Sequence, residues 1–262
     1  MARKILVTFG CSWMYGVGTG YEEGMTLKDY NILRYSVGSV EVANTVSFRG
    51  LLAKKYDFEN INFGLGGSSN QHQFLLLKKF FNSDRYKDLV KENAEIVVLH
   101  GITSTARSYF YDINANIAKD IMFNNGIAQS PAIKSYVLNY YNHEHEIQLL
   151  TEEIQFINQF YKGNGIKNLW FDTFNTHKYN FELNNFLGHN DFETRDLLSQ
   201  MALQTGIEGM DRKYHTSTWK VDSNRVEFLV SSKHLNPFSQ HPTKLGHQLI
   251  ADIISKELEN II

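Results

Sequence analysis

Three short apolar segments, each followed at once by a turn of small residues, constrain the fold of this chain more than any other feature. Residues 5–9 (ILVTF), 60–63 (NINF) and 95–100 (EIVVLH) have the length and composition of buried strands. Strands that alternate with helical patterns predict a mainly parallel sheet with helices on both faces. The small residues let the backbone turn sharply at the carboxyl edge of the sheet, where open α/β folds bind their ligands.

The rest of the chain continues this alternation. Apolar residues recur at helical spacing over 46–57, 71–91, 147–161, 191–204 and from 243 onward, and strand-like runs cover 168–174 and 225–230. Residues 26–44 are polar and irregular, which indicates a surface excursion, and the Tyr- and Asn-rich residues 105–142 indicate a helical cap or insertion. We therefore expect a single α/β domain over residues 1–262, with a mainly parallel sheet of about five strands between two helical layers.

Charge and composition narrow the range of partners. The 26 basic and 28 acidic residues form no long runs of one sign, which argues against a nucleic-acid-binding patch. The single cysteine, Cys11, excludes an internal disulfide framework and a Cys-rich zinc site. No stretch approaches the ~20 apolar residues of a membrane span, and the apolar run near the N-terminus is too short for a signal peptide core. We expect a cytoplasmic protein with no membrane or nucleic-acid partner.

The origin of the chain bears on its partners as well. Its richness in Asn, Lys, Ile and Tyr is typical of an AT-rich genome, such as that of a phage or a low-GC bacterium. Association with a virion therefore stays open, as does oligomerisation.

Ser12 is the candidate nucleophile because it follows the first strand directly. A serine hydroxyl is a weak nucleophile unless an imidazole lies within hydrogen-bond reach and donors face the developing oxyanion. His241 is the candidate base. Pro242 restrains it to extended geometry, which places His241 in the loop ahead of the last helix, with its ring free to reach the crevice.

Other patterns in the chain match their sites less well. Gly16, Gly18 and Gly20 follow a strand, but the dinucleotide fingerprint requires a glycine at position 21, which is Tyr21. Cys11 is better explained as a small buried residue than as a thiol nucleophile. The histidines match no common metal-ligand spacing, so we expect no metal and no organic cofactor. Those considered are His143, His145, His234, His241 and His247.

Four blocks of the sequence together resemble a known family. FGCSWMYG, NFGLGGSSN, VVLHGITS and HPTKLGH occur in the order, and near the strand ends, of the four blocks of the SGNH hydrolases, also called GDSL esterases. The first block resembles a subgroup with Gly-Cys-Ser followed by an aromatic residue. The resemblance spans residues 4 to about 254, although 105–235 share little beyond the order of helices and strands. It implies a flavodoxin-like three-layer sandwich and ester hydrolysis without a cofactor.

The resemblance assigns roles to individual residues. Ser12 matches the nucleophile, and Cys11 stands where the usual motif has aspartate. Gly67 matches the glycine whose backbone N–H serves the oxyanion hole together with the N–H of Ser12. Thr103 stands where the third block has an asparagine donor, so the side-chain donor is a hydroxyl or is missing, and Asn70 is a substitute if the glycine turn folds it inward.

The fourth block departs from the family at the orienting acid. The family has an aspartate three residues before the histidine, and this chain has Phe238 there. The resemblance therefore leaves three arrangements for His241: a Ser-His dyad, a backbone carbonyl as orienting group, or a carboxylate from elsewhere, for which Asp172 is the one candidate. Loss of this partner can cost orders of magnitude in rate.

Three further residues are candidates for substrate binding. Trp13 and Tyr15, next to the nucleophile, would form an apolar or sugar-stacking wall, although aromatic residues beside a strand end more often belong to the core. Arg107, six residues after Gly101, would bind an anionic group of the substrate if it faces the crevice. A surface arginine is an equally good explanation.

Two functions fit these observations. The first is a serine esterase or carbohydrate O-deacetylase that cleaves a small acyl ester by a Ser-His mechanism. The second is a non-catalytic protein of the same fold that binds a glycan or a protein partner, for instance within a phage or other assembly. The altered third and fourth blocks keep the second hypothesis open.

Overall fold

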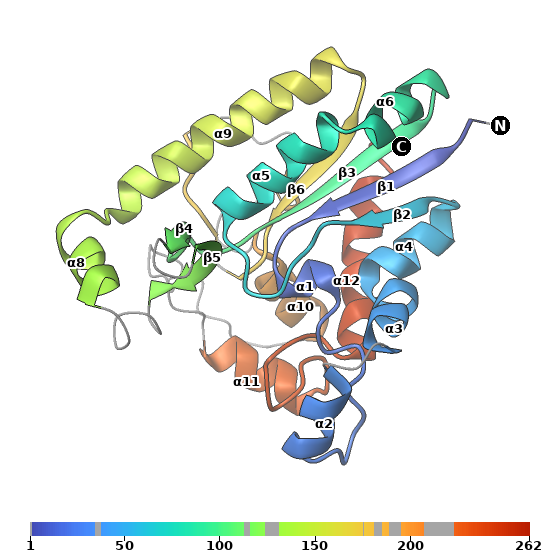
Figure 1. The fold of residues 1–262 in the computed structure, drawn as a ribbon. Helices are drawn as coiled ribbons and strands as arrows, with labels where there is room; N and C mark the ends of the chain where they lie inside the picture. The colour runs from blue at the N-terminus through green and yellow to red at the C-terminus, as the bar shows by residue number, and fades with distance from the viewer. Residues whose placement is uncertain are drawn as a thin grey trace.

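The core of the protein is a parallel β-sheet. A computed structural model describes residues 2–34, 38–112, 116–123, 131–174, 176–180, 185–188, 195–206 and 223–262. Its main sheet contains β1 (Lys4–Phe9), β2 (Glu59–Asn62), β3 (Glu95–Ile102) and β6 (Lys167–Asp172). The strands lie in the order β2-β1-β3-β6, and each neighbouring pair is parallel (Figure 1). The expected α/β class with a mainly parallel sheet is confirmed, with four strands instead of about five.

Helices cover both faces of this sheet (Figure 1). One face carries α5 (Asn70–Phe81), α6 (Asp84–Lys91) and α9 (His143–Gly163), and the other carries α3 (Gly38–Val46), α4 (Phe48–Tyr56), α10 (Leu197–Gln204) and α12 (Lys244–Leu258). The side chains of β1 alternate between the cores beneath these two helical layers.

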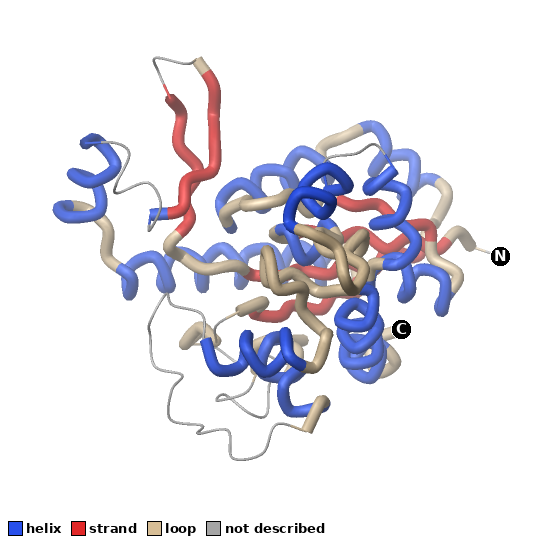
Figure 2. The backbone as a smooth tube through the Cα atoms, turned by 90° about the horizontal axis from the view of Figure 1, so that it is seen from below, coloured by secondary structure: helices blue, strands red, loops and turns tan. Residues whose placement is uncertain are grey.

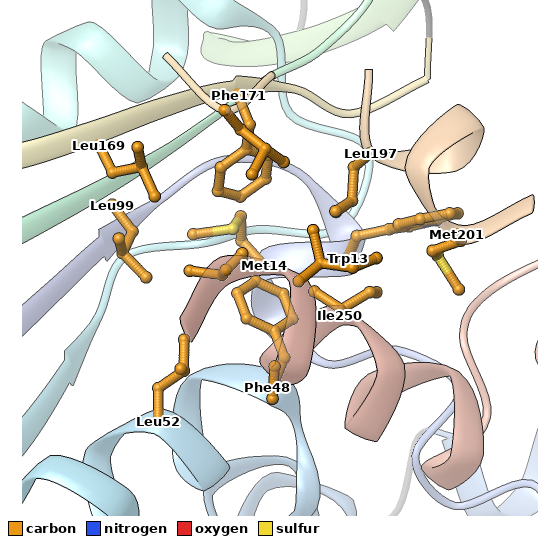
Figure 3. Packing of buried hydrophobic residues seen from close by; sticks show 14 of the residues in the cluster. Trp13, Met14, Phe48, Leu52, Leu99, Leu169, Phe171, Leu197, Met201 and Ile250 are labelled. Carbon is orange, nitrogen blue, oxygen red and sulfur yellow. The ribbon is translucent and has the colours of Figure 1, made fainter. Parts of the chain in front are cut away.

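Successive residues of β1 point to opposite faces of the sheet. Ile5 and Val7 join the core beneath α5 and α9, whereas Leu6 joins the core beneath α4 and α12. Residues 5–9 are all buried, and four of the five are apolar because both faces of the strand are covered. Figure 3 shows the second core, in which Phe48 of α4 and Ile250 of α12 pack around the nucleophile-bearing turn.

Two predictions of local structure are wrong. Residues 225–230, expected to form a strand, belong to the helix α11 (Ser223–Ser231); its buried Val226 and Leu229 lie three positions apart, as on a helix face, and a short apolar run does not separate the two states. The expected surface excursion over 26–44 contains α2 (Leu27–Arg34) and α3. Of their described side chains, Tyr30 in α2 and Ala43 in α3 are buried, which is too few to form an apolar stripe in the sequence.

The helical pattern over 71–91 is two helices rather than one. It breaks between α5 and α6, where the Ser83 hydroxyl caps α6 by accepting a hydrogen bond from the Tyr86 N–H. The helix expected over 191–204 is α10, capped by Asp196, and residues 191–194 lie outside the described part of the chain.

The segment 105–142 contains a β-hairpin as well as a helix. Its elements are β4 (Arg107–Asp112) and β5 (Ile117–Met122), paired antiparallel, and α8 (Pro131–Asn139), while 113–115 and 124–130 fall outside the described residues. Asp120 fixes the hairpin to the start of α5 by accepting hydrogen bonds from the Ser69 N–H at 2.8 Å and from its hydroxyl at 2.7 Å. Figure 2 shows the hairpin reaching away from the helical layers.

Of the helices that the described residues form, none combines the length and the apolar character needed to cross a membrane.

Candidate active site

The turn that ends β1 places Ser12 at the carboxyl edge of the sheet. Gly10 has φ +149°, and a Cβ there would lie 2.4 Å from the Met14 side chain and 2.8 Å from the Gly101 carbonyl oxygen. Only glycine therefore lets the chain pass between β3 and the short helix α1 (Ser12–Tyr15). Ser12 is the first residue of this helix and is 5% exposed, three residues beyond the end of the buried strand β1.

The imidazole of His241 lies directly against this serine. Its Nε2 is 2.8 Å from Ser12 Oγ, although the two residues are 229 positions apart. His241 sits in the loop between α11 and α12, and Thr243 then caps α12 by accepting a hydrogen bond from the Gly246 N–H. The two residues that the sequence proposed as nucleophile and base are thus within hydrogen-bond distance of each other.

The other ring nitrogen of His241 lies against the hydroxyl of Ser239. Its Nδ1 is 3.0 Å from Ser239 Oγ. That hydroxyl is in turn 2.8 Å from the Tyr30 hydroxyl and 3.0 Å from Asn236 Oδ1. None of the three arrangements expected for His241 included a serine hydroxyl.

Asp172 is not the missing acid, which corrects the one candidate carboxylate. Its Oδ1 is 2.8 Å from Nδ1 of His177 and accepts a hydrogen bond from the Tyr179 hydroxyl at 2.7 Å, while its Oδ2 accepts one from the His177 N–H at 3.0 Å. The carboxylate is committed to the loop after β6 because these contacts use both of its oxygens.

The glycine turn after β2 is fastened to the turn that carries Ser12. The Leu65 N–H and the Ser68 hydroxyl both donate to the Gly10 carbonyl, at 3.0 and 3.1 Å, and the Gly10 N–H donates to Gln73 Oε1 at 2.8 Å. These bonds fix Gly67 relative to the nucleophile.

Gly67 faces open space next to that turn. Its φ is +79°, and a Cβ added there would meet no atom within 4 Å. Within the described part of the chain, neither the Gly67 N–H nor the Ser12 N–H donates a hydrogen bond. Both remain able to donate to a ligand oxygen.

Asn70 and Thr103 tie the second turn to the end of β3. The Thr103 N–H donates to Asn70 Oδ1 and Asn70 Nδ2 donates to the Thr103 carbonyl, both at 2.9 Å. The Asn70 amide is therefore folded inward and already engaged. Thr103 Oγ1 is buried and has no hydrogen-bond partner among the described residues.

The structure separates the two aromatic residues beside the nucleophile. Trp13 is 2% exposed and packs edge-on against Phe174, with ring centroids 5.1 Å apart, inside the core that Figure 3 shows. Tyr15 is partly exposed. An apolar wall for a substrate is thus available from Tyr15 and not from the Trp13 ring.

Arg107 stands at the start of β4 with its guanidinium 5.8 Å from the centre of the Phe174 ring. Its Nε and Nη1 are buried and have no hydrogen-bond partner among the described residues. It borders a cavity of about 270 Å³ between α5 and α9, which Asn70 and Thr105 also line.

Arg49 supports the nucleophile in a way the sequence analysis missed. Its Nε donates to the Met14 carbonyl at 3.0 Å and its Nη2 to the Tyr15 carbonyl at 3.1 Å, so it caps the last turn of α1. Burial lowers the pKa of its guanidinium to about 10, which leaves it charged at neutral pH. The available signal was a lone cation on the apolar face of α4, between Phe48 and Leu52.

His247 serves packing. Burial lowers its pKa to about 3, and its Nδ1 accepts a hydrogen bond from the Phe48 N–H at 3.3 Å. Across the described residues, no three His, Cys, Asp or Glu side chains gather as a metal site requires.

Comparisons with known proteins give no match to a family model and none to a curated protein. Among solved structures, the chain resembles a protein assigned to the lipolytic G-D-S-L family from Desulfitobacterium hafniense, with 15% identity over 97% of this chain and 98% of that one and a TM-score of 0.41. It resembles the esterase EstA from Pseudoalteromonas sp. at 12% identity over 98% and 97%, with a TM-score of 0.41.

A third similar structure is an acetyl xylan esterase from Butyrivibrio proteoclasticus, at 12% identity over 98% of this chain and 64% of that one, with a TM-score of 0.46. The solved structures that this chain resembles thus include a member of the family that its four blocks resemble. Sequence identity to these three proteins is 12–15%.

Proposed function

We propose that this chain is a serine hydrolase of the SGNH type, which cleaves a small acyl ester with Ser12 as nucleophile and His241 as general base. The observation that carries the proposal is the 2.8 Å contact between Ser12 Oγ and His241 Nε2 at the carboxyl edge of the sheet. A serine becomes a competent nucleophile when an imidazole can accept its proton at this distance.

The reaction would proceed by two acyl transfers. His241 Nε2 accepts the Ser12 proton as Oγ attacks the ester carbonyl, and then returns that proton to the departing alcohol. Water, deprotonated by the same imidazole, attacks the acyl-serine; the proton returns to Ser12 Oγ and the acid leaves. Ser12, His241 and water supply all the atoms and protons that these two steps need.

The developing negative charge would be stabilised by backbone donors. The Ser12 and Gly67 N–H groups meet no acceptor among the residues that the structure describes, and the hydrogen bonds between Gly10 and residues 65–73 hold both turns in place. Donors that are fixed before the reaction need no rearrangement in the transition state, which is why such sites contribute strongly to rate.

The proposal extends to the kind of ester. Tyr15 and the open space beside Gly67 would accept a small acyl group on a sugar, so a carbohydrate O-acetyl ester is our first choice. Arg107 would bind an anionic group on that substrate. The assignment is supported by the place of Arg107, a partly exposed cation beside the cavity between α5 and α9.

Ser12→Ala tests the reaction itself. The wild-type protein should hydrolyse 4-nitrophenyl acetate and should be labelled by a fluorophosphonate at Ser12, as read by mass spectrometry of peptides. Ser12→Ala should do neither, whereas Ser231→Ala, which alters an exposed hydroxyl on α11, should behave as wild type. Hydrolysis that survives in Ser12→Ala would refute the proposed nucleophile.

Arg107→Gln tests the anionic part of the substrate. It should lower kcat/KM for a nitrophenyl hemisuccinate about tenfold or more while leaving the neutral acetate ester within about twofold. Arg85→Gln, which alters an exposed arginine paired with Glu59, is the control. Equal losses on both esters would remove Arg107 from the specificity assignment.

The non-catalytic alternative is favoured by the two altered blocks, which have Thr103 in place of the family's asparagine and Phe238 in place of its acid. A protein that only binds a glycan would bind it equally well after Ser12→Ala and would react with neither probe. The same pair of measurements therefore decides between the two functions.

A further inference from the structure

We infer that Ser239, held by Tyr30 and Asn236, is the positioning residue of His241, so that a neutral hydroxyl network takes the place of the family's aspartate. The inference rests on the proposed function for its kinetic meaning. Its structural basis is independent of that function, because it follows from the contacts around the Nδ1 side of the ring.

The direction of each hydrogen bond follows from the chemistry of Asn236. Its Oδ1 lies within reach of the N–H groups of Phe238 (3.2 Å) and Ser239 (2.8 Å), and its Nδ2 donates to the His241 carbonyl at 3.0 Å. The oxygen and nitrogen of the amide are thereby distinguished. In the network that we infer, the Ser239 hydroxyl donates its single hydrogen to Asn236 Oδ1, at 3.0 Å, because Oδ1 can only accept.

The remaining contacts of Ser239 Oγ must then be accepted ones. The Tyr30 hydroxyl donates to it at 2.8 Å, and His241 donates its Nδ1–H at 3.0 Å. A neutral imidazole protonated at Nδ1 keeps its lone pair at Nε2. That lone pair faces Ser12 Oγ at 2.8 Å, which is the tautomer that a general base requires.

The network is anchored by buried elements. Asn236 is fully buried and Tyr30 is 2% exposed. The loop closes on itself through the Asn236 N–H to the His241 carbonyl at 2.9 Å and the Gln240 N–H to the Asn236 carbonyl at 3.0 Å. Tyr30 comes from α2, so the segment that looked like a surface excursion supplies part of the site.

Phe238, which stands where the family has its acid, packs against two tyrosine rings beside this network. The centroid of its ring lies 5.9 Å from that of Tyr30 and 5.9 Å from that of Tyr21. It therefore packs against the phenol ring that donates to Ser239. A carboxylate at position 238 would lose this packing. The hydroxyl network thus holds the Nδ1 side of the His241 ring through groups that are themselves neutral.

The chain carries a matched control for this arrangement. Ser232 Oγ lies 3.0 Å from Nδ1 of His234, with the same two-residue spacing and the same distance as the Ser239–His241 pair, but this second pair does not touch Ser12. Comparing Ser239→Ala with Ser232→Ala separates the loss of any Ser-His contact from the loss of the one at the nucleophile.

Steady-state kinetics on 4-nitrophenyl acetate should distinguish the two variants. Ser239→Ala should lower kcat about 10- to 100-fold with KM within about twofold, because only the orientation of the base is lost. Ser232→Ala should stay within about twofold of wild type. Tyr30→Phe should lower kcat about threefold, which corresponds to the loss of one neutral hydrogen bond. Ser239→Thr keeps the hydroxyl and should retain most of the wild-type kcat.

Nitrogen-15 NMR of the His241 ring gives a readout that does not need catalysis. The Nδ1–H tautomer should predominate in the wild type and lose population in Ser239→Ala, with Ser232→Ala unchanged. If wild type hydrolyses no ester but this tautomer shift occurs, the proposed function fails and the positioning network stands. If Ser239→Ala matches Ser232→Ala in both tautomer and kcat while both are folded by thermal unfolding, the network is refuted.

Discussion

Gly18 offers the sharpest test of how the chain holds its base in place. It lies in the loop after α1 with φ +101°, and a Cβ built on it would sit 2.3 Å from the Pro242 carbonyl oxygen and 3.0 Å from the Cβ of His241. Gly24 lies further along the same loop with φ +88°, but a Cβ there would meet no atom within 4 Å. Alanine at either position has an unfavourable positive φ, but only alanine at Gly18 would also displace His241. Comparing Gly18→Ala with Gly24→Ala therefore separates the two effects.

The two variants should differ more in activity than in stability. Both pay about 1–2 kcal/mol for alanine at positive φ, and Gly18→Ala adds about 1–3 kcal/mol for overpacking. Relief of the 2.3 Å contact to an ordinary separation of 3.4 Å moves the Pro242 backbone, and His241 with it, by about 1.1 Å. Because a misplacement of about 1 Å can cost about 100-fold in rate, Gly18→Ala should lose about 30- to 100-fold in kcat/KM.

Hydrolysis of 4-nitrophenyl acetate and thermal unfolding measure the two effects side by side. Gly24→Ala should lower Tm by about 2–8 °C, as expected for about 1–2 kcal/mol in a chain of this size, and keep near-wild-type kcat/KM. Gly18→Ala should lower Tm further and lose activity even well below its Tm. If folded Gly18→Ala retains kcat/KM within about threefold of Gly24→Ala, the fit of Gly18 against Pro242 does not position His241.

Two further predictions concern buried polar groups. Asn70→Ala should lower the free energy of unfolding by about 2 kcal/mol or more in urea titrations, because it strands the N–H and carbonyl of Thr103 in the interior; an unchanged midpoint would contradict this. His247 has a folded pKa of about 3 against about 6.5 when unfolded, so between those values the unfolded state binds more protons and stability falls as the pH falls. His247→Gln should flatten that slope by up to about 1.4 kcal/mol per pH unit between pH 6 and 4, as measured by urea unfolding at each pH, and an unaltered slope would show that His247 does not carry it.

The parallel sheet was predictable because its strands are buried on both faces. Such strands are continuous apolar runs that end abruptly at glycine and serine, as residues 5–12 do, and this pattern is local. The helices α2 and α3 were not predictable for the converse reason. Among the side chains whose burial the structure describes, α2 buries Tyr30 and α3 buries Ala43, so tertiary packing rather than periodicity decides their state.

The segment 225–230 shows the same limit at shorter range. Its apolar residues suit a strand or a helix equally, and the layer formed by α10 and α12 selects the helix by burying Val226 and Leu229. The length and local composition of this segment do not determine whether it forms a strand or a helix.

The sequence by itself determined the parallel α/β architecture, the strand end that carries Ser12 and the loop that carries His241, because strand burial, glycine turns and the Pro242 restraint all act over a few residues. The tertiary structure alone decided what surrounds the imidazole. The Ser12 contact, the Ser239 hydroxyl, the Tyr30 phenol from α2 and the close fit of Gly18 against Pro242 join positions up to 229 residues apart. Hydrogen bonds of about 3 Å depend on where each element packs, and no pattern of neighbouring residues encodes that distance.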